Sequence, residues 1–259
     1  PTVQLAKGVQ AARDLRCSIL KRVATSPQLL PNGDVLAMAG YDSATGIYIA
    51  FGGIQWPSIP AKPTQAEALA ALNFLYANVL CDFPFRSNAA RVAACAAILT
   101  VVVRNAIAGP VPLFLIDSPS AGTGKNLLAN AIGTIGEGKL PPSTPANIPE
   151  FEFEKRITAL TLADDHLVLF DDVTNGLGNS TLNAVLTTTR WAGRILGKSE
   201  RVNLDLSMTF FATGNNVQLK GDMQRRTIPI TIDAGCEHPE NRTNFTHPNL
   251  LAHVQSKRV

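Results

Sequence analysis

The stretch from Leu113 to Ala129, LFLIDSPSAGTGKNLLA, constrains the fold more than any other part of the chain. An apolar run typical of a buried strand ends in a turn that contains Gly122 and Gly124, and Lys125 opens a segment with helical spacing. Strand, glycine turn and helix N-terminus are the context that a phosphate-binding loop requires. The backbone N–H groups, the helix N-terminus and the lysine attract phosphates. The stretch predicts a nucleoside triphosphate site, and the alternative is a turn without a ligand.

Two positions of this loop depart from the pattern G-x-x-x-x-G-K-[ST], because Pro119 stands first and Asn126 stands last. The hydroxyl at the last position normally ligates Mg²⁺. The carbonyl oxygen of Asn126 is also a hard donor, although its geometry differs. We therefore expect Asn126 to be a metal ligand. The residues expected to surround the phosphates are Ser120, Ala121, Gly122, Thr123, Gly124, Lys125, Asn126 and Leu127.

Length and composition describe a globular protein with room for an α/β core and a smaller appendage, at 259 residues with 46% hydrophobic and 17% charged residues. The net charge of +3 permits nucleic-acid binding without requiring it. The four cysteines form no C-x-x-C pair, which predicts reduced core thiols in the cytoplasm. The longest apolar run, Val92 to Val103, is too short to cross a membrane and predicts a buried helix over residues 88–107. The first residue is proline and the last four are SKRV, so we expect a piece of a longer protein.

The chain divides into two parts on composition. Residues 1–63 are expected to form a small β-rich segment with a hairpin around Gly46, after a stretch of helical spacing over residues 9–23. Residues 64–259 are expected to hold a helical lead-in, which begins at the cap residue Thr64, and the core with the glycine loop.

Two acidic residues end a second apolar strand, HLVLFDD, at Asp171 and Asp172. A first carboxylate at the end of a buried strand can hold Mg²⁺, and a second can orient and polarise an attacking water. The alternative is a pair of aspartates that caps a turn. The phosphate loop earlier in the chain favours the functional interpretation.

Three further groups of polar residues follow. Asn215 follows the apolar strand MTFFA (Met208 to Ala212), where its amide can bind the attacking water or stabilise a turn. Arg225 and Arg226 precede the next strand and can act on a neighbouring subunit's phosphate, or remain ordinary surface residues. The stretch from Arg194 to Leu206 predicts a hairpin with a basic tip, either a DNA contact or a solvated turn. Its candidate DNA-binding residues are Arg194, Lys198 and Arg201.

The order of these motifs resembles the AAA+ ATPases, and the details resemble superfamily 3 helicases and the primase-helicase proteins of viruses, phages and plasmids. The segments FATGNN and GDMQRRTIPI carry the resemblance, together with the double acid, over about residues 64–248. Other segments resemble long uncharacterised proteins of bacterial genomes and prophages. The resemblance implies a mostly parallel sheet flanked by helices, with ATP and Mg²⁺ as ligands.

The resemblance also implies roles for single residues. Lys125 would bind phosphate, Asp171 would hold the metal with Asn126, Asp172 would orient water, Asn215 would sense the terminal phosphate, and Arg226 or Arg225 would act in trans. A ring, expected to be a hexamer, would move on single-stranded DNA in the bacterial host cytoplasm, with a primase as a possible partner. The alternatives are a degenerate, nucleotide-gated scaffold or loader, and a structural domain that binds no nucleotide.

Overall fold

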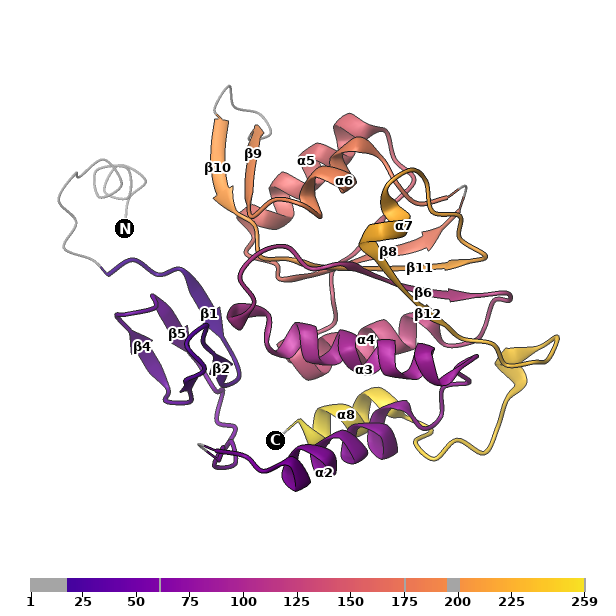
Figure 1. Ribbon diagram of the computed structural model, residues 1–259, viewed down its shortest axis with the longest axis horizontal. Helices are drawn as coiled ribbons and strands as arrows, with labels where there is room; N and C mark the ends of the chain where they lie inside the picture. The colour runs from indigo at the N-terminus through magenta and orange to yellow at the C-terminus, as the bar shows by residue number, and fades with distance from the viewer. Residues whose placement is uncertain (1–17, 61, 175, 195–200, 259) are drawn as a thin grey trace, which may run out of the picture.

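A five-stranded parallel sheet forms the centre of the computed structural model, which describes residues 18–60, 62–174, 176–194 and 201–258 (Figure 1). Every pair of neighbouring strands in this sheet runs parallel. The predicted α/β class with a mostly parallel sheet is confirmed. Across the sheet the order is β12 (Thr227–Thr231), β6 (Leu113–Ser118), β11 (Thr209–Asn215), β8 (Leu167–Val173) and β7 (Ser143–Pro145).

Helices cover both faces of this sheet (Figure 1). On one face lie α5 (Glu150–Leu162) and α6 (Ser180–Val185). On the other face α3 (Asn88–Val102) and α4 (Lys125–Glu137) pack against the strands. Below these two helices an outer layer holds α2 (Gln65–Leu75) and the C-terminal helix α8 (Leu250–Lys257), drawn in yellow.

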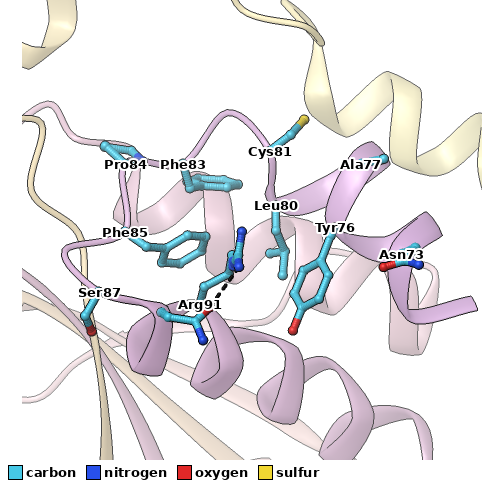
Figure 2. Close-up of a pocket in the computed structure, with 11 residues that line it drawn as sticks. Asn73, Tyr76, Ala77, Leu80, Cys81, Phe83, Pro84, Phe85, Ser87 and Arg91 are labelled. Atoms are coloured by element: carbon cyan, nitrogen blue, oxygen red, sulfur yellow. Dashed lines mark hydrogen bonds between the residues drawn. The ribbon is translucent and has the colours of Figure 1, made fainter. Parts of the chain in front are cut away.

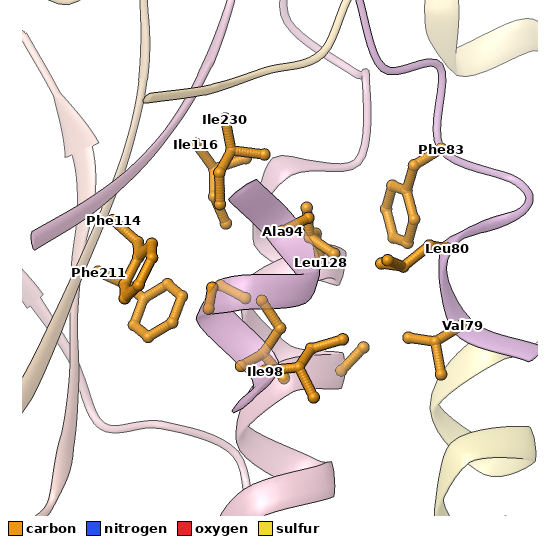
Figure 3. Close-up of a cluster of buried hydrophobic side chains, with 14 of the residues drawn as sticks. Val79, Leu80, Phe83, Ala94, Ile98, Phe114, Ile116, Leu128, Phe211 and Ile230 are labelled. Carbon is orange, nitrogen blue, oxygen red and sulfur yellow. The ribbon is translucent and has the colours of Figure 1, made fainter. Parts of the chain in front are cut away.

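The first four residues of β6, Leu113 to Ile116, are all apolar because helices cover both faces of this strand. Phe114 and Ile116 pack in the cluster shared with α3 and α4, whereas Leu113 and Leu115 pack in the cluster shared with α5 and α6. Alternate residues of a strand face opposite sides of a sheet, so a strand covered on both faces needs a continuous apolar run. The first cluster is drawn in Figure 3, where Phe114 stacks on Phe211 with ring centroids 5.4 Å apart.

The strand register brings the polar ends of three strands to one edge of the sheet. Asn215, the last residue of β11, pairs with Ser118, the last residue of β6. On the other side of β11, Gly214 pairs with Val173 at the end of β8. The glycine loop, the acid pair and Asn215 therefore share the carboxyl edge, where ligands bind in open parallel sheets.

The N-terminal segment forms small sheets of its own. Strands β4 (Gly40–Asp42) and β5 (Ile47–Ile49) pair antiparallel, as the hairpin prediction requires. Strand β1 (Arg22–Ala24) joins β5 in parallel, so the predicted helix over residues 9–23 is wrong at its end; residues 9–17 lie outside the described part. The alternation at β1, with Arg22 and Ala24 buried and Val23 exposed, fits a strand rather than a helix. Strands β2 (Gln28–Leu29) and β3 (Val35–Leu36) form a separate antiparallel pair.

The two helices predicted before the glycine loop are present, but each α-helix is shorter than predicted. Thr64 and Glu67 form the expected capping box, but α2 ends at Leu75 and continues as the π-helix η1 (Tyr76–Leu80). Helix α3 ends at Val102 and is followed by the 3-10 helix η2 (Arg104–Ala106). The prediction of a buried helix holds for the face of α3 that meets the sheet and α4, whereas the opposite face is exposed. The exposed apolar residues are Val92, Leu99 and Val102.

Three other boundaries also differ. The proline-rich stretch over residues 136–149 predicts a surface loop, but residues 143–145 form the short edge strand β7. The sequence predicts a helix capped by Ser180, but the cap of α6 is Asn179, because Asn179 Oδ1 accepts a hydrogen bond from the backbone N–H of Leu182 at 2.7 Å. The sequence also predicts that this helix runs to Trp191, but α6 ends at Val185 and Trp191 belongs to β9 (Arg190–Arg194), which pairs with β10 (Arg201–Asp205).

The cysteines of the described residues do not all lie in the core. Of the cysteines in the described residues, Cys95 is buried, whereas Cys81 and Cys236 are exposed, so the prediction of core thiols is wrong for two of them. Within the part of the chain that the structure describes, no helix has the length and apolar character needed to cross a membrane.

Close packing of α3 on α4 depends on Gly136. A Cβ atom at this position would lie 2.2 Å from Cγ1 of Val101, a buried and branched side chain that has little room to move. We expect Gly136→Ala to lower the free energy of unfolding by about 1–2 kcal/mol, because overpacking outweighs the better helix propensity of alanine. Urea denaturation measures this change, and a variant of equal or higher stability would contradict the packing argument.

Candidate functional site

A cavity of about 360 Å³ lies at the carboxyl edge of the sheet, between the glycine loop and the ends of β8 and β11. The loop has the left-handed backbone that its glycines permit, with φ of +74° at Gly122 and +95° at Gly124. At Gly122 the space is also closed, since a Cβ atom would lie 2.8 Å from Oε2 of Glu240. The carbonyl oxygen of Pro119 accepts a hydrogen bond from Asn216 Nδ2 at 3.3 Å. Proline at the first position therefore fits the loop.

Lys125 joins the glycine loop to the end of β11. Its Nζ donates to Oδ1 of Asn215 at 2.7 Å and to the carbonyl oxygen of Ser120 at 3.2 Å. Burial lowers the pKa of Lys125, and the carboxylates of Asp117, Asp172 and Asp171 oppose this effect. The ammonium group is thus held at the cavity with acids nearby and two acceptors that phosphate oxygens can replace.

Asp171 and Asn126, the two predicted metal ligands, are in direct contact. Nδ2 of Asn126 donates to Oδ1 of Asp171 at 2.9 Å, and Oγ1 of Thr213 donates to the same oxygen at 2.8 Å. A cation at Asp171 requires the amide of Asn126 to rotate so that its carbonyl oxygen, rather than its NH₂ group, points inward. Two protein oxygens suit Mg²⁺, which keeps several waters and phosphate ligands. Among the described residues no cluster of three or more His, Cys, Asp or Glu exists that would suggest another metal site.

Both aspartates line the same cavity because β8 contains a bulge. Phe170 pairs with Ala212 and Val173 pairs with Gly214, so Asp171 and Asp172 together face Thr213. Neighbouring residues of a regular strand point to opposite faces, and a bulge redirects one of them. Asp172 absorbs the change with a left-handed φ of +49°.

A second, apolar cavity of about 170 Å³ lies on the other side of the glycine loop, under the C-terminal segment. Phe83 packs beneath Gly124, with a ring carbon 3.5 Å from where a Cβ atom would stand. The guanidinium of Arg242 lies over the ring of Phe245, 5.2 Å from its centroid. Thr123 is buried here, and its hydroxyl has no hydrogen-bond partner within the described ranges. A buried hydroxyl without a partner at a cavity wall is a group that a ligand can satisfy.

Some residues of the site carry no signal in the sequence. Thr213 is an unremarkable strand residue until the bulge sets it against Asp171. Asp117 is half-buried near Lys125; burial raises its pKa, against hydrogen bonds from backbone N–H groups and the charge of Lys125. Glu240 reaches the loop from a distant segment. Of these residues only Asp117 has a signal in the sequence. It follows the apolar run before SPSAGTGK, and a residue in that place lies at the edge of the sheet.

Arg225 and Arg226 lie at the opposite edge of the sheet from their own glycine loop. They end the short helix α7 (Met223–Arg226), and Asp222 binds both guanidinium groups, at 2.6 and 3.3 Å. Thr227, the next residue, pairs with Leu113 at the start of β6. The length of β6, about 17 Å at about 3.3 Å per residue, separates this edge from the loop. The arginines do not serve the site of their own chain.

The β9–β10 hairpin rises from the amino edge of the sheet, at the upper left of Figure 1. Arg194 and Arg201 are paired across the two strands, and the first strand begins earlier than predicted, at Arg190. Trp191 anchors the hairpin on α5, because its Nε1 donates to Thr158 Oγ1 at 2.9 Å. Lys198 lies outside the described residues, and contact of this hairpin with DNA stays a prediction.

A larger open cavity of about 750 Å³ lies between η1 and the start of α3 (Figure 2). Tyr76, Phe85 and Arg91 line it, and Arg91 lies over the Tyr76 ring at 5.0 Å. None of its lining residues is acidic. This larger cavity therefore lacks the combination of acids and lysine that lines the smaller cavity at the carboxyl edge.

Comparison with known proteins gives likeness in structure but not in sequence. No protein-family model and no curated protein sequence matches the chain. The C-terminal region of NrS-1 matches with a TM-score of 0.49 at 16% identity, over 72% of this chain and 43% of that one. Inhibitor-bound JCV helicase matches with a TM-score of 0.40 at 19% identity, over 62% of this chain and 44% of that one.

NtrX from Brucella abortus in complex with ATP matches with a TM-score of 0.37 at 17% identity, over 65% of this chain and 42% of that one. This chain thus spans less than half of each of these solved chains. These are likenesses in structure at low sequence identity, and nothing about activity follows from them.

The bulge at Asp172 predicts how two substitutions differ. Asparagine tolerates left-handed backbone nearly as well as aspartate, whereas a β-branched residue there costs about 1–2 kcal/mol. We expect Asp172→Asn to keep the unfolding free energy of the parent and Asp172→Val to lose about that amount in urea denaturation. Equal stability of the two variants would show that the backbone at this position is regular strand.

Proposed function

We propose that the chain binds ATP with Mg²⁺ and hydrolyses it, as the motor of a ring that acts on single-stranded DNA. One observation carries the proposal: the lysine of a glycine loop, the paired aspartates and Asn215 converge on one cavity from three adjacent strand ends. A turn without a ligand gives no reason for a half-buried lysine among carboxylates, or for a bulge that turns two acids into one cavity.

The two cavities beside the loop fit the two ends of a nucleotide. Phosphates fit the larger one, where Lys125 and the loop N–H groups supply donors. The base fits the apolar cavity between Phe83 and Phe245, where Thr123 has a free hydroxyl. Asp171 and Asn126 would hold Mg²⁺, which neutralises charge on phosphate oxygens when bound.

Two residues are suited to the attacking water. Asp172 lines the cavity next to Asp171 and can accept a proton from a water bound in front of it. Asn215 can donate or accept through its amide once Lys125 turns from it to phosphate. Removing either group is expected to slow hydrolysis more than binding.

A nucleotide-gated scaffold or loader with little hydrolysis is the second candidate, and Asn126 favours it. Its NH₂ group occupies one oxygen of the proposed metal ligand Asp171, whereas a hydroxyl at this position would itself ligate the ion. Nucleotide would then close the site without efficient turnover.

Hydrolysis measured in the parent chain and in an Asn126 variant separates the DNA motor from the scaffold. We expect Asn126→Thr to lower the Mg²⁺ concentration for half-maximal ATP hydrolysis about three- to ten-fold, because the hydroxyl replaces an amide that must rotate. Hydrolysis is followed over a Mg²⁺ series with and without single-stranded DNA. Turnover that rises with DNA in both proteins supports a DNA motor, and ATP binding without turnover in both supports the scaffold.

The arginine pair is proposed to act on the phosphate of a neighbouring subunit in a ring, expected to be a hexamer. Arg225 is 76% exposed and Arg226 is 26% exposed, so Arg225 is the more accessible of the two. A bacterial host cytoplasm as the location, and a primase as a partner, follow from the family resemblance.

Mixing of variants tests this action in trans. Arg225→Ala and Arg226→Ala are each expected to lose hydrolysis, as is Asp172→Asn. Mixed subunits of an arginine variant and Asp172→Asn are expected to regain part of the activity, because some interfaces combine an intact arginine with an intact aspartate. If every mixture stays inactive while the single variants still assemble, the assignment between subunits is wrong.

A further inference from the structure

Arg104 is a buried guanidinium at the amino edge of the sheet, opposite the nucleotide site. Its side chain is 4% exposed. Nη1 donates to the carbonyl oxygen of Ile107 and Nη2 to that of Gly109, both at 3.0 Å, which fixes the turn that leads into β6. A guanidinium carries five N–H groups, so further donors remain for another acceptor.

The positive charge of Arg104 is not balanced by a nearby acid. No carboxylate in the described part of the chain pairs with it, and its pKa is lowered first by burial and then by the charge of Arg22. Arg22 is also buried and forms an ion pair with Glu137 at 3.2 Å. Buried charges in proteins are normally paired. Glu137 and Asp164 offset the charge of Arg22, whereas Arg104 has no paired carboxylate among the described residues.

A polar cavity of about 290 Å³ opens beside Arg104 at the base of the β9–β10 hairpin. Arg190 supplies a second guanidinium to its wall, and Thr189 and Ser207 supply hydroxyl groups. Asp205 lies 3.6 Å from Nε of Arg190, but the two side chains are 90% and 81% exposed. A solvated pair of this kind is weak, so Arg190 is available to an incoming anion.

We propose that this cavity binds a phosphate group between Arg104 and Arg190. Guanidinium groups match phosphate oxygens in shape and charge, and the hydroxyl groups can complete the contacts. The phosphate can belong to a nucleic-acid backbone that passes the base of the hairpin, or it can be free phosphate. The site is separate from the glycine loop and does not depend on ATP hydrolysis.

Titration of inorganic phosphate in the Lys125→Ala background, in which the glycine loop lacks its lysine, tests the site. We expect Arg190→Ala in that background to weaken phosphate binding about ten-fold by calorimetry, through loss of one charged contact. Arg86→Ala, which removes an exposed arginine that does not line this cavity, is the matched control and should bind as the parent does.

Fluorescence anisotropy with a labelled single-stranded oligonucleotide then identifies the source of the phosphate. A weaker affinity of Arg190→Ala, with a salt dependence reduced by about one phosphate contact, assigns the site to a nucleic-acid backbone. Unchanged oligonucleotide binding with weaker phosphate binding assigns it to free phosphate. If the parent shows no phosphate binding, or if Arg190→Ala equals Arg86→Ala in both titrations, the proposal is wrong. Neither result bears on ATP binding at Lys125.

Discussion

Parallel pairing of three strands in a common register is the constraint on which the site depends. Because β6, β11 and β8 end together, Ser118, Asn215 and the acid pair meet at one edge without any long excursion of the chain. Both faces of each strand are buried, so the register is fixed by many side chains at once. The geometry of the polar residues therefore follows from the packing of the apolar ones.

The charged groups at this edge suit an anion that binds together with a cation, such as a phosphate chain with Mg²⁺. Lys125 is held among Asp117, Asp171 and Asp172, and it interacts with neutral oxygens of Asn215 and Ser120 rather than forming a close ion pair. Phosphates can therefore displace weak partners instead of breaking a salt bridge. The bulge in β8 adds the second acid at the expense of one left-handed residue, a form of local strain common at functional sites.

Much of the fold and the candidate site could be predicted because the signals are local. Each core strand is a short apolar run followed by polar residues, so Asp171 and Asn215 could be placed at strand ends, and Lys125 at the start of the helix after the glycine loop, from the sequence. The bulge could not be predicted, because it depends on which residue of β11 faces Phe170. The contact of Glu240 with the glycine loop joins segments far apart in the chain. The start of the hairpin at Arg190 could not be predicted, because Trp191 continues the helical spacing of the residues before it. In the fold, a hydrogen bond to Thr158 of α5 holds Trp191 in the hairpin.

Direct measurement of nucleotide binding tests the central claim that these strand ends form a nucleotide site. Calorimetric titration with ATP and Mg²⁺ is made on the parent chain, on Lys125→Ala and on Lys139→Ala, which alters an exposed lysine that does not line the cavity. The account predicts binding by the parent and by Lys139→Ala, and at least about ten-fold weaker binding by Lys125→Ala, since a charged contact to phosphate is lost. Absence of binding in the parent, or equal affinity in the two lysine variants, would contradict it.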